Sequence, residues 1–303
     1  MMDIVWKLFS DYTFQIVALG SALLGGISGI LGSFAVLKKQ SLLGDGVSHA
    51  ALPGVVLAFL LTGSKSTEVL LLGALITGLI ATFLIVSIEK STRIKFDSAL
   101  ALILSVFFGL GLVLLTYSQK IPNANQAGLD RFIYGQASAL VKKDLMILLV
   151  CGVVLIGIVL LFWKEFKIFI FDEQFAKTIG FNTKFLNGLL TFLIVVTIIL
   201  GLQTVGVILM SSMLIAPAVA ARQWSNKLSV MVILASLFGA ASGIVGTFIS
   251  SLTTNLPTGP IIVVCITIIA IFSLLFAPQR GIISKIIQRR KNKAKFELQR
   301  RVK

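Results

Sequence analysis

Charged side chains are scarce in this chain of 303 residues, where Asp, Glu, Lys and Arg together make up 13% of the sequence. A soluble domain normally carries about 25%. Hydrophobic residues reach 57%, and the mean hydropathy is +1.00. This composition excludes an ordinary soluble domain and predicts a chain that lies within a lipid bilayer. We expect no cleavable signal peptide, because a basic segment and a small-residue cleavage site are missing before a long hydrophobic stretch.

Histidine and cysteine are equally scarce, with one histidine, His49, and two cysteines, Cys151 and Cys265. Both cysteines lie in apolar runs without metal-ligand spacing, and we interpret them as small core residues. A single histidine leaves no Ser/His/Asp or Cys/His set for nucleophilic catalysis. The segment Gly63–Ser66 lacks both the residue order and the preceding strand of a phosphate-binding loop. The chain is therefore not expected to be an enzyme, and any ATP hydrolysis is expected in a separate subunit.

Hydrophobic runs fill most of the sequence, and a membrane span needs about 20 apolar residues. The runs are Phe14–Val36, Gly46–Thr62, Val69–Ile88, Ala99–Thr116, Leu145–Trp163, Phe185–Gly201, Val205–Ala221, Leu228–Ser251 and Pro260–Ala277. The second and sixth runs are short, so a chain with eight crossings is the alternative to one with nine. We predict an all-α integral membrane protein, a polytopic helical bundle formed by residues 1–279 and followed by a basic tail, residues 280–303.

The net charge of +15 is concentrated near the C-terminus. From Arg280 onward the chain holds ten Lys and Arg residues and one acid, Glu297. A basic segment directly after a span usually lies in the cytoplasm, so we place the C-terminus there and expect no nucleic-acid partner. Alternation then places the other basic loops inside as well, with Leu202–Thr204 as a short outer turn. Only Lys120–Asp144, which is expected outside, departs from the rule that Lys and Arg gather in cytoplasmic loops. Long loops cross the membrane with little regard to charge.

Two connecting segments are too long to be simple turns. Lys120–Asp144 contains Leu129–Gly135, which is apolar and aromatic enough to dock a partner. Lys164–Lys184 contains Phe171–Gly180, which is acidic at its start and ends in glycine. This second pattern is typical of a short amphipathic helix on the cytoplasmic side. The alternative for both segments is a solvated connector.

Two ionisable residues stand out at the start of the second run. Asp45 and His49 are four residues apart, which places both side chains on one face of a helix. Counting about 1.5 Å per residue from Lys39 puts Asp45 about 9 Å and His49 about 15 Å into a core about 30 Å thick. Ionisable groups at that depth usually face a partner, a cavity or a transported ion, and carboxylate with imidazole is a natural half-site for Mn²⁺ or Zn²⁺. The alternative is an Asp–His hydrogen bond that only joins two helices.

The surroundings of this pair bear on its use. Gly44, Gly46 and Pro53 predict a loosened helix around the two side chains. The other acids fall in or beside predicted loops, so one chain supplies too few ligands for a metal. Two copies around a two-fold axis would supply two Asp and two His, a set that suits a transition metal. A proton relay and an ion filter are the alternative uses of the same pair.

Four segments carry a family resemblance, and they follow one another in order along the chain. They are Leu43–Ala50, Phe171–Gly180, Met213–Ala218 and Leu256–Pro260. Over nearly its whole length the chain resembles the membrane permease subunit of the bacterial ABC-3 metal importers, the manganese, zinc and iron uptake family. The first segment is specific, and the others support it mainly by their order.

The resemblance implies a homodimer or a paired permease in the bacterial cell membrane. It also implies two cytoplasmic ABC ATPases and an extracellular metal-binding lipoprotein, and no permanently bound cofactor. Ser48–Gly54 is similar to the manganese and iron members more than to the zinc members, so the implied cargo is Mn²⁺, with Zn²⁺ or Fe²⁺ as alternatives. A proton-coupled secondary metal transporter is the less favoured alternative. The tail from Arg280 is longer than the family's usual ending, and we assign it no role.

The same resemblance makes Phe171–Gly180 the segment that couples the permease to its ATPase. Within it, Asp172 and Glu173 are expected to meet basic groups of the ATPase. The small residues Ala176 and Gly180 are expected to allow the ATPase to approach closely.

Overall fold

The computed structural model describes residues 11–120, 135, 137, 140–252, 256–286 and 288–289. The helices in this part of the chain are α2 (Tyr12–Leu37), α3 (Leu43–Thr62), α4 (Thr67–Ser91), α5 (Phe96–Gln119), α7 (Lys142–Leu161), α8 (Trp163–Phe171), α9 (Glu173–Thr178), α10 (Thr183–Val205), α11 (Val207–Trp224), α12 (Leu228–Ser251) and α13 (Thr258–Phe276). Nine of these described helices, all except α8 and α9, are long and apolar enough to cross a membrane. The predicted all-α bundle with nine spans is confirmed.

The two runs that are short in the sequence form helices of ordinary spanning length. α3 has 20 residues, because the helix begins at Leu43, before the apolar run. α10 has 23 residues and begins at Thr183, where the side chain of Asn182 accepts a hydrogen bond from the backbone N–H of Phe185 at 3.1 Å. Both helices are among the nine candidate spans, so the alternative with eight crossings is not needed.

The connection between α10 and α11 is shorter than the sequence predicts. Leu202–Thr204, expected as an outer turn, is helical, and the prediction is wrong: the break is Gly206 alone. Gly206 has φ +86° and ψ 166°, a backbone conformation that is essentially restricted to glycine. One residue therefore separates α10 from α11, and α10 continues through the polar Gln203 and Thr204 to Val205.

The centre of the bundle is a close contact between α2 and α12. A Cβ atom added at Gly25 or Gly29 of α2 would collide with the backbone carbonyls of Gly239 and Ala235 of α12, and one added at Gly243 would collide with Ser21. Small residues at intervals of four on both helices therefore bring the two backbones together. This is the packing that membrane helices use where lipid removes the hydrophobic driving force.

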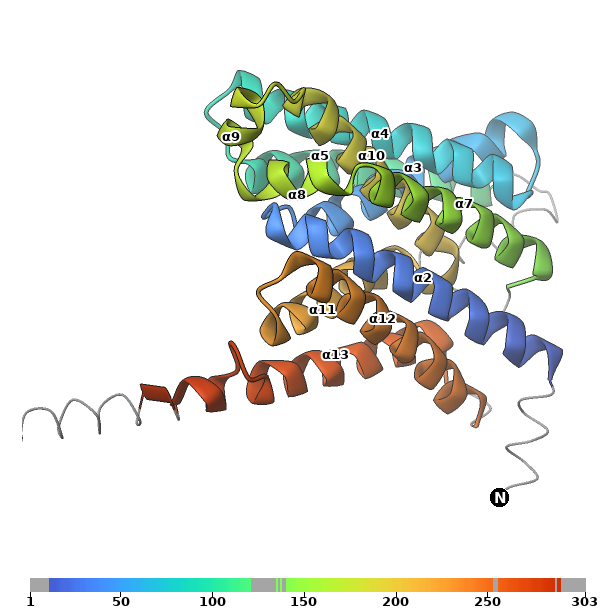
Figure 1. Ribbon diagram of the computed structural model, residues 1–303. Helices are drawn as coiled ribbons and strands as arrows, with labels where there is room; N and C mark the ends of the chain where they lie inside the picture. The colour runs from blue at the N-terminus through green and yellow to red at the C-terminus, as the bar shows by residue number, and fades with distance from the viewer. Residues whose placement is uncertain are drawn as a thin grey trace, which may run out of the picture.

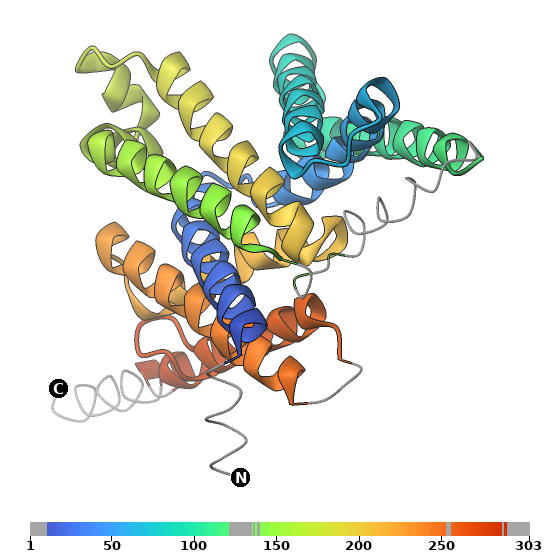
Figure 2. The ribbon, with the colours of Figure 1, turned by 90° about the vertical axis from the view of Figure 1, so that its right-hand side faces the viewer.

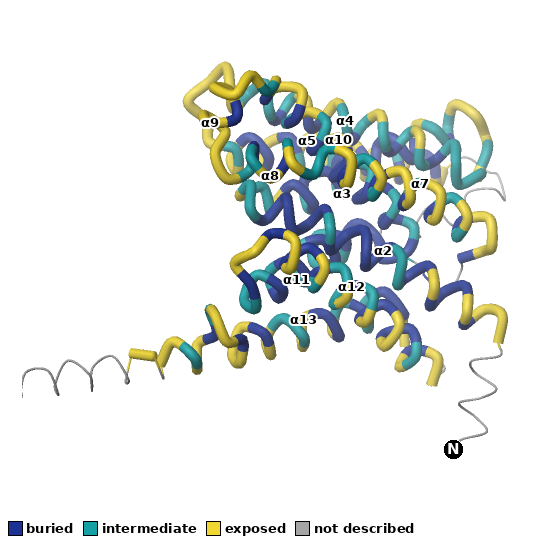
Figure 3. The backbone as a smooth tube through the Cα atoms, in the orientation of Figure 1, coloured by how far each residue is buried: buried dark blue, intermediate teal, exposed yellow. Residues whose placement is uncertain are grey.

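The remaining helices form two groups around α2. Figure 1 shows α2 between α7 on one side and α11, α12 and α13 on the other, and Figure 2 shows α3, α4 and α5 apart from α7. Buried residues concentrate in α2, α3 and α10, whereas α9 and the helix ends are exposed (Figure 3). The outer faces of α4, α5 and α7 carry exposed large apolar side chains such as Phe83, Val113 and Leu160. Those faces suit contact with lipid.

The start of the predicted tail is attached to the bundle. The guanidinium of Arg280 donates hydrogen bonds to the Asn226 side chain at 2.8 and 3.1 Å, and its backbone N–H donates to the carbonyl of Gln223 at 3.2 Å. Arg280 therefore packs with the loop between α11 and α12. Residues 290–303 lie outside the described residues.

Candidate metal site and coupling helix

The first turns of α3 place the predicted metal ligands. The connection from α2 turns sharply at Lys39, which has φ +61°, and the helix starts at Leu43 with the N–H of Asp45 donating to the carbonyl of Leu42 at 3.1 Å. Asp45 therefore lies in the first helical turn, where the unpaired backbone N–H groups stabilise a carboxylate. His49 follows one turn further along the same face.

Asp45 and His49 face one another. Nε2 of His49 lies 3.5 Å from Oδ1 of Asp45, and the side chains are 17% and 41% exposed, respectively. The imidazole ring meets the Phe108 ring of α5 edge to face, with 4.6 Å between centroids. Nδ1 of His49 is buried and has no hydrogen-bond partner among the described residues. The histidine is thus oriented by one carboxylate and one aromatic ring, and its Nδ1 atom makes no hydrogen bond to the described residues.

The separation of the two ligand atoms is compatible with one metal ion. Two N or O ligands, each about 2.1 Å from a metal, are about 3.0–3.4 Å apart, close to the 3.5 Å between Nε2 of His49 and Oδ1 of Asp45. Within the described residues, no group of three or more His, Cys, Asp and Glu side chains could hold a metal. The metal site at Asp45 and His49, and its completion by a second copy, stay predictions.

The small residues beside Asp45 have a different role from the predicted one. α3 is continuous through Pro53, so the expectation of a loosened helix is wrong. A Cβ atom at Gly46 would lie 2.8 Å from Leu100 of α5, and one at Gly44 would lie 3.2 Å from Leu214 of α11. The glycines thus allow α3 to pack tightly between its neighbours, which fixes the direction of the two ligand side chains.

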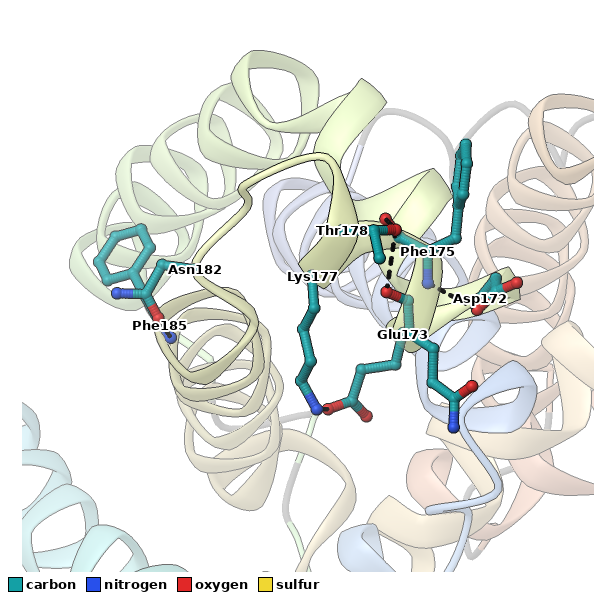
Figure 4. A network of polar contacts seen from close by, with 8 residues as sticks. Asp172, Glu173, Phe175, Lys177, Thr178, Asn182 and Phe185 are labelled. Carbon is teal, nitrogen blue, oxygen red and sulfur yellow. Dashed lines mark hydrogen bonds and ion pairs between the residues drawn. The ribbon is translucent and has the colours of Figure 1, made fainter.

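The predicted coupling segment forms α9, which is built by its own polar residues (Figure 4). The Asp172 carboxylate accepts a hydrogen bond from the N–H of Phe175 at 2.9 Å and caps the helix. Glu173 pairs with Lys177 at 2.8 Å. Gly180 follows the helix with φ +97° and open space around its Cα. Asp172 and Glu173 thus already have partners in the chain.

Exposed apolar side chains on α9 and directly beside it were not predicted. Ala176 is fully buried, so its side chain is not on the outer face of the helix. Phe175 lies on α9, Phe171 ends α8 and Ile179 directly follows α9, with 54%, 59% and 49% of their surface exposed. Their spacing of four residues is the signal in the sequence that could have found them. A partner that contacts this face would meet two phenyl rings and an isoleucine rimmed by charges.

Lys38 contacts α8 from the end of α2. It caps the C-terminus of α2, and its buried Nζ lies 5.3 Å above the centre of the Phe169 ring of α8. Burial lowers the pKa of Lys38 to about 8, although Glu173 and Glu89 act in the opposite direction. Lys38 therefore joins the C-terminal end of α2 to α8 through this cation–ring contact.

The outer docking segment predicted at Leu129–Gly135 cannot be compared, because residues 121–134 lie outside the described residues. At its end, Gly135 lies against the backbone of Val205 and Gly206. The segment therefore returns to the bundle at the connection between α10 and α11.

Comparison with known proteins gives consistent matches along the whole bundle. The model of the ABC 3 transport family matches residues 10–277. The zinc transport system membrane protein TroC of Treponema pallidum is 50% identical over 290 residues, 96% of this chain and 97% of that protein. The manganese transport system membrane protein MntC of Bacillus subtilis is 46% identical over 288 residues, 95% of this chain and 66% of that protein. The solved structure of PsaBC from Streptococcus pneumoniae in complex with Fab has a TM-score of 0.81 at 31% identity and covers 92% of this chain and 98% of that chain.

Proposed function

Because the chain belongs to the ABC 3 transport family, which matches residues 10–277, we propose that it carries a divalent transition-metal ion into the bacterial cell. It is a multi-pass membrane permease, and the ATPase is a separate protein. The metal ion is the cargo that passes through the permease. The basic residues from Arg280 onward support a cytoplasmic C-terminus.

The observation that carries this proposal is the Asp45–His49 pair. It lies near the start of a spanning helix, half-buried, with Nε2 of His49 3.5 Å from Oδ1 of Asp45. Nδ1 of His49 is unpartnered in the described part of the chain. Oxygen and nitrogen ligands at this separation suit Mn²⁺ or Zn²⁺. Two copies of the chain would bring two such half-sites to one path.

We assign α9 and its exposed apolar face to the partner ATPase. A homodimer or paired permease, two ATPases and an extracellular metal-binding lipoprotein complete the importer. The similarity to PsaBC at a TM-score of 0.81 supports a shared architecture of the permease.

We assign manganese as the cargo because Ser48–Gly54 is similar to the manganese and iron members of the family, and zinc is the second candidate. Relatives named for manganese and zinc are 46% and 50% identical to this chain. Carboxylate and imidazole accept both ions, and the same ligands bind Zn²⁺ more tightly than Mn²⁺. Selection for manganese then depends on delivery or on release rather than on affinity. Zn²⁺ is therefore expected to inhibit Mn²⁺ uptake.

The test is uptake of radioactive manganese and zinc into membrane vesicles of known orientation that contain the permease and its ATPase. Uptake that requires ATP supports the importer, whereas uptake driven by a proton gradient alone supports a secondary transporter. D45N and H49Q should both lose uptake, and the control D97N, in the first turn of α5, should retain it. Normal uptake by D45N and H49Q would remove these residues from the site.

A further inference from the structure

An apolar crevice runs along the bundle between α7 and α12, with α2 at its floor. Figure 1 shows α2 lying between those two helices. The crevice consists of a cavity of about 810 Å³ next to α8 and a second cavity of about 330 Å³ further along the same helices. Ile156 of α7 and Ser236 of α12 line both cavities. A crevice of this shape on the surface of a membrane-spanning bundle is open to the acyl chains of the bilayer.

A polar pocket adjoins the crevice at its α8 end. This third cavity, of about 370 Å³, shares Trp163 and Ser229 with the largest one. Lys167 of α8 and Lys227, the residue before α12, line it. Lys164 lines the adjoining crevice and lies on the same face of α8 as Lys167, three residues away. The α8 end of the crevice is therefore basic, and an indole ring marks its boundary.

We propose that the crevice and its basic pocket form a binding site for one anionic glycerophospholipid. An acyl chain lies along α2 between α7 and α12, and the phosphate lies between Lys164, Lys167 and Lys227. Basic pockets between helices at the cytoplasmic side bind anionic lipid headgroups, and Trp side chains favour the headgroup level of a bilayer. Charge and shape thus point to the same ligand.

Glu165 makes the choice of headgroup more specific. This carboxylate also lines the crevice, and its Oε2 is buried without a hydrogen-bond partner in the described residues. Three lysines against one carboxylate favour a lipid of net negative charge over a zwitterionic one. A headgroup hydroxyl, as in phosphatidylglycerol, would donate to Oε2 of Glu165 while the phosphate pairs with the lysines.

The lipid site does not depend on the metal pathway. The leaflet is the cytoplasmic one if the proposed orientation is correct, but the cavities and lysines stand without it. Because α8 precedes α9 directly, a lipid held here would steady the helix that leads into the coupling segment.

The test measures lipid retained by the purified full-length permease. The protein is extracted, incubated with equal amounts of phosphatidylglycerol and phosphatidylethanolamine, and examined by native mass spectrometry. K167Q/K227Q should weaken phosphatidylglycerol retention about thirtyfold, since each lysine at a membrane surface contributes about 1 kcal/mol. The control K95Q/K184Q removes two exposed lysines that line none of the three cavities and should retain the lipid.

A second pair of variants tests the crevice without changing charge. I156W fills the shared wall of the two apolar cavities and should reduce retention, whereas V154W, on the exposed face of α7, should not. Equal retention of the two lipids by the unmodified protein, or equal loss in both lysine double variants, would overturn the proposal. The readout needs neither ATP nor metal, so it stands apart from the vesicle experiment on transport.

Discussion

Two pairs of side chains in this protein share the same spacing on a helix but differ in burial and in their remaining interactions. Asp45–His49 on α3 and Glu173–Lys177 on α9 are both four residues apart, at 3.5 Å and 2.8 Å. The first pair is partly covered by α5, and one histidine nitrogen is left without a described partner. The second is exposed to solvent and each charge is neutralised by the other. Spacing puts two groups together, but burial and unused ligand capacity determine whether they can bind an ion.

The largest expected effect is on the α3 pair. We propose that Asp45 and His49 act as one half-site, so D45A, H49A and the double variant should all reduce metal uptake to background, with the double variant no worse than either single one. Uptake into vesicles and copurification of the ATPase are measured together. If the two single losses multiply in the double variant, the residues act independently, and the shared site is wrong.

The next effect concerns the exposed apolar face of α9. F175S should release the ATPase from the purified complex, because it removes an aromatic side chain that is 54% exposed from the proposed interface. Q174S, a neighbouring exposed position, is the control and should leave copurification unchanged. Retention of the ATPase by F175S would assign the contact to another part of the permease.

Lys38 is expected to respond to pH. Its pKa is about 8 in the folded chain against the ordinary value of 10.5, so the unfolded chain binds more protons between these values and stability rises with pH across that window. K38M should therefore raise stability by up to about 3 kcal/mol at about pH 7, and the gain should disappear as the pH approaches about 10.5. Thermal unfolding in detergent at both pH values measures it, and a gain that does not depend on pH would contradict the burial argument.

A change at Ala176 distinguishes packing within the permease from direct contact with the ATPase. A176W should destabilise α9 by about 1–3 kcal/mol, because the fully buried site has no room for an indole. The loss of ATPase binding that follows should be reversed in part by lowering the temperature. A stable A176W protein that still fails to bind the ATPase would instead place Ala176 at the interface.

The smallest effect belongs to the exposed pair. E173Q removes an interaction worth about 0.3–0.5 kcal/mol, so transport should change by about twofold at most. A large loss of uptake without a change in stability would show that Glu173 contacts the ATPase directly, as the sequence led us to expect.

The nine spans could be predicted because a membrane span requires a long run of apolar residues. Such a run is visible in the sequence and does not depend on which helices pack against it. The sequence also located Asp45 and His49, since ionisable residues are conspicuous at the start of such a run. It failed where tertiary packing decides the outcome. Gly44 and Gly46 pack against Leu214 and Leu100. The sequence shows only that glycine makes a helix more flexible, and it does not show which side chains pack against these two positions.

The coupling segment shows the same limit. Its polar residues predicted a short helix correctly, and α9 covers Glu173–Thr178. Which side of a six-residue helix faces inward depends on α8 and α10, so Ala176 was assigned to the outer face and Phe175 was overlooked. Six residues contain too few turns for periodicity to identify a buried face.

The contact between α2 and α12 has a mechanical consequence. The backbones of α2 and α12 touch at Gly25, Gly29 and Gly239 with no side chain between them at these positions, so we expect the two helices to move as one rigid unit. We then expect a change between outward-open and inward-open forms to rotate the other helices about the pair of α2 and α12. Since α3 begins one short connection beyond the end of α2, we expect its first turn, with Asp45, to lie near the pivot, where a small rotation changes the direction of a ligand more than its position.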